Sequence, residues 1–211
     1  GFNAMSRDAG YDSYDSEELW SYEIGAKSQF LENRLIVNGA LFYMDIDDMQ
    51  VTESFAGVPW TYITNVGTAV SYGAELEVQA KITSQFTMTG NVGYTNAEYD
   101  EYMDDAGDYR DNKVPNVPEY TFAIGGQYRP GNGFYAGVDL VGVGKTYLGR
   151  TNTYEREAYQ LINAKTGYES ENLDIYLYGK NIFDEDYSTN INPYIFYSKP
   201  REIGVKLTYR F

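Results

Sequence analysis

The chain has 211 residues, of which 17% are aromatic, and its 23 tyrosines far outnumber its 2 tryptophans. Its mean hydropathy is −0.50, and no stretch approaches the roughly 20 apolar residues that a membrane-spanning helix needs. The formal net charge of −15 argues against a nucleic-acid partner, because such partners are bound by basic surfaces.

Apolar and polar residues alternate with period two in nine segments, a pattern typical of β-strands that separate two different environments. In chain order these segments are 20–27, 35–44, 72–81, 86–94, 120–128, 134–140, 162–168, 173–180 and 202–211. The last is the clearest, since Ile203, Val205 and Leu207 alternate with Gly204 and Lys206. The sequence therefore predicts an all-β fold.

The connections between these segments alternate in length. Short turns are predicted at 31–34, 83–85, 129–133 and 169–172, and long links at 45–70, 95–119, 145–159 and 182–201. This pattern favours an antiparallel transmembrane β-barrel whose short turns face the periplasm. The alternative, a soluble β-sandwich or barrel, explains the alternation but gives no reason for a long link at every second connection.

Charged residues gather on the polar faces of the predicted strands. A Lys or Arg that faces lipid near the middle of a membrane costs about 2 to 4 kcal/mol. We therefore expect ten charged side chains to point into the lumen. They are Glu23, Lys27, Glu75, Glu77, Lys81, Asp139, Lys165, Lys180, Lys206 and Arg210.

Topology suggests that further strands belong to this barrel. A terminal strand that ends on an aromatic residue, here Phe211, resembles the signal read by the outer-membrane assembly machinery, which places the C-terminus in the periplasm. Nine strands counted back from there begin outside, whereas bacterial barrels have an even number of strands. We expect at least one earlier strand, with residues 1–3 fitting its end, and an open or externally closed sheet.

Several segments resemble, in family order, strand motifs of the TonB-dependent receptors. Residues 19–27 are similar to the W-x-Y-E-x-G-x-K strand, 64–77 to the N-x-G and G-x-E-x-E pair, and 179–187 to x-x-N-L-F-D-x-x-Y. Three further segments resemble the next strand with its exit, the P-x-x-P entry and the P-R start of the last strand. They are 41–50, 114–120 and 200–201.

The resemblance implies a 22-stranded barrel, of which this chain would supply the last nine or ten strands over 1–211. It implies energised uptake of a scarce nutrient, most often a ferric siderophore, across the outer membrane of a Gram-negative bacterium. It also implies contact with the TonB complex through an N-terminal plug, and with membrane lipid and lipopolysaccharide. No cofactor is expected.

Ligand contacts in such receptors come from the outward loops, where aromatic rings stack on a chelate and Arg pairs with its anionic groups. The candidates are Trp60, Tyr62, Tyr102, Tyr109, Arg110, Tyr147, Arg150, Tyr154, Arg156, Tyr194, Phe196 and Tyr197. Haem is disfavoured, since haem receptors use outward-loop His and this chain has none. The acidic net charge leaves a cationic, neutral or cobalamin-like ligand as an alternative to an anionic ferric siderophore. The alternative function is a passive porin-like channel or a structural outer-membrane barrel.

The sequence indicates no catalytic site. The chain has no His and no Cys, which excludes Ser-His-Asp triads, His-based zinc sites and Cys nucleophiles within it. We interpret Glu75 and Glu77 as a polar wall and not as an acid-base pair. The Gly-rich segment 142–145 lacks the phosphate-loop spacing. The acidic segments 8–18 and 98–111 do not have EF-hand spacing, and we interpret them as solvated loops and not as Ca²⁺ sites.

Overall fold

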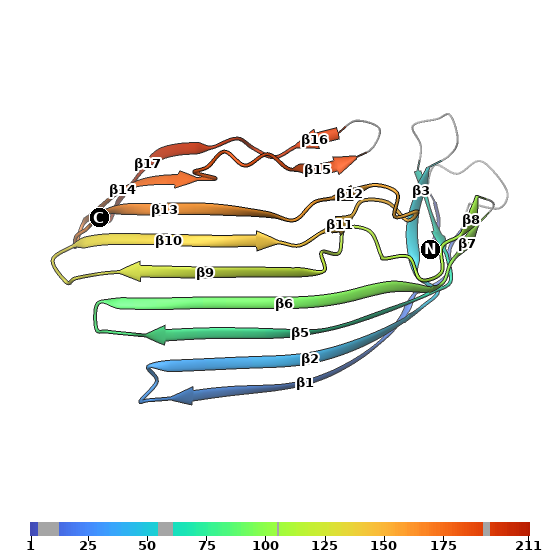
Figure 1. Ribbon diagram of the computed structural model, residues 1–211, viewed down its shortest axis with the longest axis horizontal. Coiled ribbons are helices and arrows are strands. Elements are labelled where there is room, and N and C mark those ends of the chain that lie inside the picture. Colours follow the sequence, from blue (N-terminus) through green and yellow to red (C-terminus); the bar gives the residue numbers. More distant parts are fainter. Residues whose placement is uncertain (4–12, 55–60, 105, 192–194) are drawn as a thin grey trace.

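A computed structural model describes residues 1–3, 13–54, 61–104, 106–191 and 195–211. Nine long strands form one antiparallel sheet in the order β1-β2-β5-β6-β9-β10-β13-β14-β17 (Figure 1). Their bounds are β1 Glu18–Phe30, β2 Leu35–Asp47, β5 Thr68–Lys81, β6 Phe86–Glu101, β9 Tyr120–Tyr128, β10 Phe134–Val143, β13 Tyr159–Glu169, β14 Leu173–Lys180 and β17 Glu202–Tyr209. The predicted all-β fold and its nine strands are confirmed.

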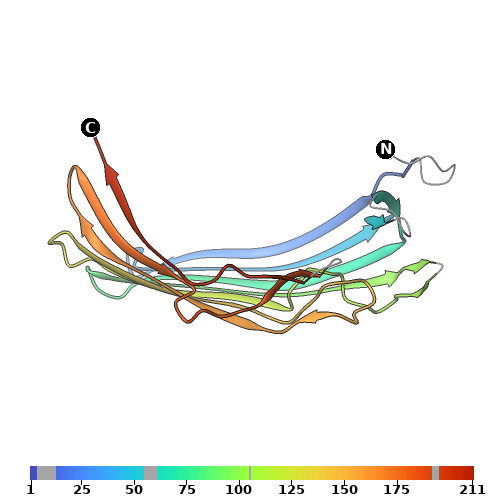
Figure 2. The ribbon, with the colours of Figure 1, turned by 90° about the horizontal axis from the view of Figure 1, so that it is seen from above.

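The sheet is open and curved. Its two edges are β1 and β17, and each inner strand pairs with both of its neighbours in the sheet order. Figure 2 shows the strands bent into a trough, with both chain termini rising on the same side. The described residues thus form a curved sheet that does not close on itself. They contain no helix long and apolar enough to cross a membrane.

Four small hairpins lie at one end of the sheet, which we call the hairpin end, and the short turns lie at the other, the turn end (Figure 1). The hairpins are β3 (Gln50–Ser54) with β4 (Thr61–Asn65), β7 (Met103–Asp104) with β8 (Gly107–Asp108), β11 (Thr146–Tyr147) with β12 (Glu155–Arg156), and β15 (Ser188–Ile191) with β16 (Ile195–Tyr197). The predicted alternation of short and long connections is therefore present.

Six of the nine strands extend further than predicted at the hairpin end, and β6 and β5 do so by the most residues. β6 continues to Glu101, β5 begins at Thr68 and β13 begins at Tyr159. The extensions of β5 and β6 pair with each other, with Ala69 opposite Tyr99. Ala69 and Tyr99 are buried there with Tyr102 and Tyr109 in a small core. Packing against this core keeps the polar segment after Tyr94 in a strand.

Elsewhere the sheet is a single layer with one apolar face. Ile124 of β9 lies between Gly90 of β6 and Leu140 of β10, and these positions repeat the alternation of the sequence. Seven hydrophobic residues are buried among those the structure describes, and Ile124, Leu76 and Leu177 are all exposed. Exposed apolar side chains in such a band are expected where a sheet contacts an apolar environment such as lipid.

Candidate functional site

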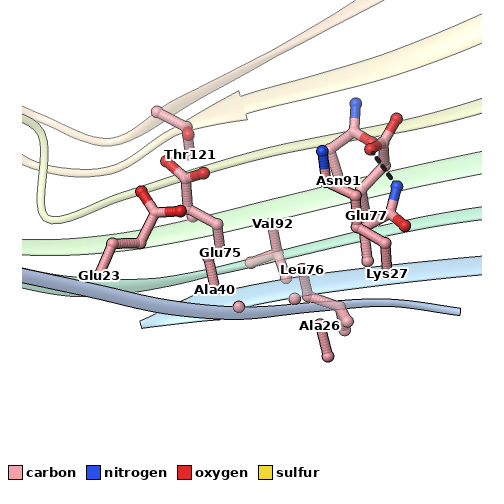
Figure 3. A pocket seen from close by; sticks show the side chains of 14 residues that line it. Glu23, Ala26, Lys27, Ala40, Glu75, Leu76, Glu77, Asn91, Val92 and Thr121 are labelled. Atoms are coloured by element: carbon pink, nitrogen blue, oxygen red, sulfur yellow. Dashed lines mark hydrogen bonds between the residues drawn. The ribbon is translucent and has the colours of Figure 1, made fainter. Parts of the chain in front are cut away.

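The polar face of the first strands surrounds a cavity of about 740 Å³. Glu23 and Lys27 of β1 and Glu75 and Glu77 of β5 all line it. Figure 3 shows Glu23, Glu75 and Thr121 in one group and Lys27, Glu77 and Asn91 in a second. The Asn38 amide donates a hydrogen bond of 2.9 Å to Glu77 Oε2. This part of the wall carries three carboxylates and one ammonium group.

The polar face of the last strands surrounds a second cavity, of about 650 Å³. Asp139, Lys165, Lys180 and Lys206 line it, so this part of the wall is mainly basic. Lys165 Nζ lies 3.6 Å from the centre of the Tyr176 ring, which places the ammonium group in cation–π contact. The two halves of one sheet face thus differ in charge.

Eight of the ten charged residues expected on the lumen side line these two cavities. Of the remaining two, Lys81 lies on the same face of β5 as Glu77, and Arg210 follows β17 and forms an ion pair with Asp174. All ten belong to the polar pattern of the sheet. That this face lines the lumen of a closed barrel stays a prediction.

A third cavity, of about 350 Å³, lies at the hairpin end between the segment that joins β12 to β13 and the segment that joins β14 to β15. We call it the hairpin-end cavity. Its lining is Glu155, Arg156, Glu157, Ala158, Tyr159, Glu185, Asp186, Tyr187, Ser188 and Tyr197. A further cavity of about 280 Å³ shares Tyr159 and Glu185 with it and extends towards Tyr120.

Two tyrosine rings form one side of the hairpin-end cavity. Tyr159 and Tyr187 stack with ring centres 3.7 Å apart and ring planes 8° apart. The Arg156 guanidinium lies over the Tyr159 ring at 5.5 Å and donates from Nη2 to Thr146 Oγ1 at 3.1 Å. The contacts of Tyr159 with Arg156 and with Tyr187 therefore join β12 to the segment after β14.

The scaffold motif at 179–187 fixes another part of the cavity lining. The Asn181 side chain is buried, accepts a hydrogen bond from the Glu185 amide at 2.8 Å and donates one to the Glu185 carbonyl at 2.9 Å. Asp184 accepts from the Arg201 amide at 2.6 Å. These bonds close the loop after β14 into a tight turn. They hold Glu185, Asp186 and Tyr187 at the cavity.

A second cluster joins three of the hairpins, and we call it the Arg150 cluster. Arg150 forms ion pairs with Glu53 of β3 and with Asp104 of β7, the latter at 2.7 Å. Tyr102 donates to Glu53 at 2.6 Å, and Tyr109 donates to Asp104 at 3.1 Å. The guanidinium lies 5.1 Å from the Tyr109 ring centre. One arginine thus connects the β3–β4, β7–β8 and β11–β12 hairpins.

The predicted ligand contacts fall into distinct places. Arg156 and Tyr197 line the hairpin-end cavity. Tyr102 and Tyr109 are only 3% and 6% exposed, so within the Arg150 cluster their rings offer little surface to a ligand. Arg150 is engaged in the same cluster. These three residues therefore join hairpins, and a ligand contact by any of them stays a prediction.

The other candidates are spread over the hairpin end. Tyr62 lies in β4 opposite Glu53, and the Tyr147 ring lies 4.7 Å from Lys145 Nζ. Arg110, Tyr154 and Phe196 are exposed. Trp60 and Tyr194 lie outside the described residues. Tyr159 and Tyr187 line the hairpin-end cavity but were not among the candidates. Tyr159 stands at the end of a predicted long link, and Tyr187 belongs to a scaffold motif.

The acidic segment 98–111 and the Gly-rich segment 142–145 make structural contacts. Asp104 accepts hydrogen bonds from the backbone amides of Ala106 and Gly107 at 2.8 and 3.1 Å. Within the described residues no group of three or more possible metal ligands is arranged to hold an ion. Gly142 lies inside β10, beside the Phe122 ring, which fills the place of a side chain.

Acidification should open the Arg150 cluster only at low pH. Burial raises the pKa of Asp104, but hydrogen bonds from Ala106 and Tyr109 and the charge of Arg150 outweigh it, so the pKa lies below the ordinary value of 3.8. A carboxyl with a lowered pKa in the folded state contributes stability above its unfolded pKa and loses it as pH falls through its folded pKa. We expect hydrogen exchange in segment 99–112 to accelerate only below the ordinary carboxyl pKa. The Asp104→Asn variant should lack this step, and opening near neutral pH would contradict the assignment.

Residues 1–182 match the family model described as TonB dependent receptor-like, beta-barrel. The Catecholate siderophore receptor Fiu of Escherichia coli (strain K12) is 31% identical over 175 residues, which are 81% of this chain and 22% of that protein. The Probable TonB-dependent siderophore receptor PiuA of Acinetobacter baumannii is 27% identical over 198 residues, 90% of this chain and 26% of that protein. The chain thus spans about a quarter of the length of these relatives.

Solved structures show the same arrangement of strands. The siderophore receptor PiuA of Acinetobacter baumannii superposes with a TM-score of 0.77 at 26% identity, covering 95% of this chain and 29% of that one. The ferric yersiniabactin uptake receptor FyuA of Yersinia pestis gives a TM-score of 0.76 at 22% identity, covering 92% and 30%. The second likeness concerns the fold alone. The open nine-stranded sheet therefore corresponds to part of the wall in these larger chains.

Proposed function

This chain belongs to the TonB-dependent receptors, proteins of the Gram-negative outer membrane, and we propose that it forms the C-terminal wall of a receptor that takes up a ferric siderophore. Energy would come from the TonB complex through an N-terminal plug. The observation that carries the proposal is the division of one sheet into an apolar face and a cavity-lined charged face. The names of Fiu and PiuA support the class of cargo.

The same division supports the other partners that we propose. The exposed apolar face, including Ile124 and Leu177, suits membrane lipid, with lipopolysaccharide in the outer leaflet. Phe211 is fully exposed at the end of the chain, next to Tyr209 with ring centres 5.1 Å apart. We propose that it is read by the outer-membrane assembly machinery. The net charge of −15 supports the absence of a nucleic-acid partner.

We propose a transport role without catalysis. The matched family consists of transport receptors, and the sequence offers neither His nor Cys for nucleophilic or general-base chemistry. The charged pair Glu75 and Glu77 lines an open cavity, with Glu77 bonded to Asn38. The same lack of His supports a siderophore over haem as the cargo.

Growth of a deletion strain tests this function. Under iron limitation the strain should lose growth on at least one ferric siderophore, while growth on haem and the response to cobalamin stay unchanged. The intact gene should restore growth, but not in cells that lack TonB, because uptake against a gradient needs that energy source. Restoration without TonB would indicate a passive channel. Loss of growth on haem alone would contradict the proposed cargo.

A further inference from the structure

We propose that the hairpin-end cavity binds a positively charged arm of the cargo, so that this receptor selects ferric siderophores that carry an ammonium group. The inference rests on the proposed function and adds the chemical class of the ligand. It is carried by the volume of the cavity, the charges around it and the tyrosine rings beside it.

The volume of the cavity fits one arm of a chelate. Small-molecule sites enclose roughly 300 to 1,000 Å³, and this cavity of about 350 Å³ lies at the low end of that range. It opens beside the smaller cavity of about 280 Å³ that reaches Tyr120. A bulky iron centre would therefore stay in the wider space over the sheet while a flexible arm enters here.

The charges around the cavity favour a cation. Glu155, Glu157, Glu185 and Asp186 line it together with one positive side chain, Arg156. Lys145 Nζ lies 2.6 Å from Glu155 and compensates that carboxylate. Among the described residues no ion pair involves the other three carboxylates. An ammonium group in this cavity would meet the carboxylates of Glu157, Glu185 and Asp186, none of which forms an ion pair among the described residues.

Arg156 does not present its charge freely to an anion. Its guanidinium lies over Tyr159 and donates to Thr146, whose side chain is fully buried. Its Nε is buried and has no hydrogen-bond partner in the described part of the chain. The same cavity is lined by Glu155, Glu157, Glu185 and Asp186, whose charges would repel an anionic arm.

Tyrosine rings supply the second contact that a cation needs. Tyr187 and Tyr197 line the cavity on the side of the β15–β16 hairpin, and the Tyr197 side chain is exposed. The face of a tyrosine ring attracts an ammonium group within about 6 Å of its centre. Carboxylates next to such rings give a site that takes an organic cation and disfavours a polyanion.

Two probes that differ in one charge test this inference. Ferrioxamine B is a ferric trihydroxamate with a free ammonium group, and its N-acetylated form lacks that charge. With the full receptor purified in detergent at low ionic strength, calorimetry should show about tenfold tighter binding of the ammonium form. The Glu157→Gln/Glu185→Gln double variant should reduce this ratio to about one.

The controls separate this inference from the proposed function. Glu171 lies in the turn before β14 at the other end of the sheet, so Glu171→Gln should leave the ratio unchanged. Equal affinity for the two probes, a ratio that survives in the double variant, or binding of a trianionic ferric tricatecholate alone would overturn the charge selection and leave siderophore uptake intact. Failure of every ferric chelate to bind would overturn both.

Discussion

Replacing Ile124 with lysine should lower the free energy of unfolding in lipid vesicles by about 2 to 4 kcal/mol, the cost of a cation on the lipid face near mid-membrane. Ile124 lies in the middle of β9, on the apolar face and about half exposed. Its neighbours across the strands are Gly90 and Leu140. No acidic side chain is placed on that face beside it, so the new charge would meet lipid.

The matched control is Ala123→Lys, one residue earlier on the same strand. Ala123 pairs with Asn91 and Val141 and lies on the same face as Thr121, which lines the first cavity of the polar face. The same new side chain should there change the free energy of unfolding by about 0.5 kcal/mol or less. Both variants are measured by urea unfolding in vesicles. Equal costs for the two would show that the faces are wrongly assigned.

The strands were predictable because a two-sided wall leaves a strong period-two signal. The predicted segments 120–128 and 173–180 coincide with β9 and β14. In both, apolar residues such as Phe122, Ile124 and Leu177 alternate with small or polar ones. The pattern is dictated by two solvents and not by packing between distant residues, so it can be read locally.

The end of β6 was not predictable in this way. After Tyr94 the sequence places polar residues on both faces, which favours a loop. In the structure Lys113 Nζ donates to Asn96 and lies 2.6 Å from Glu98 Oε1. A single lysine from a later segment thus satisfies two polar side chains of one strand. Such a long-range partner leaves no mark in the local pattern.

The candidate site shows the same limit. Residue type alone indicated Arg156 and Tyr197, which do line the hairpin-end cavity. It did not separate them from Arg150 and Tyr102, whose burial depends on how three hairpins meet. The tyrosine pair of the cavity was hidden for a related reason, because Tyr159 and Tyr187 come together only when the loop after β14 folds back.

Replacing Arg150 with methionine should open three hairpins while the nine-stranded sheet stays folded. The change keeps an unbranched side chain about as long as the aliphatic stem of arginine but removes the ion pairs with Glu53 and Asp104 and the contact with the Tyr109 ring. These side chains are 17% to 29% exposed. Solvent therefore screens part of the loss, and we expect about 1 to 3 kcal/mol, below the cost of breaking a fully buried pair.

Hydrogen exchange at two backbone amides measures this loss. The Tyr109 amide donates to the Tyr102 carbonyl at 2.8 Å, and the Tyr99 amide donates to the Asn112 carbonyl at 3.0 Å. The first bond joins two residues of the Arg150 cluster and the second lies next to it, so exchange at both should accelerate by about 5- to 160-fold, the factor equivalent to a loss of about 1 to 3 kcal/mol. Amides in the middle of β9 should keep their protection, because no side chain of that strand contacts Arg150 in the described cluster.

Arg110 provides the control for charge and position. Arg110 follows the β7–β8 hairpin directly, is exposed, and has a long ion pair of 3.8 Å with Asp108. Arg110→Met removes one positive charge from the hairpin end but leaves the Arg150 contacts intact. Hydrogen exchange at the Tyr99 and Tyr109 amides of this variant should therefore stay within about twofold of the parent protein, as for a surface substitution. Similar acceleration in both variants would mean that general charge, and not the geometry around Arg150, holds the hairpins together.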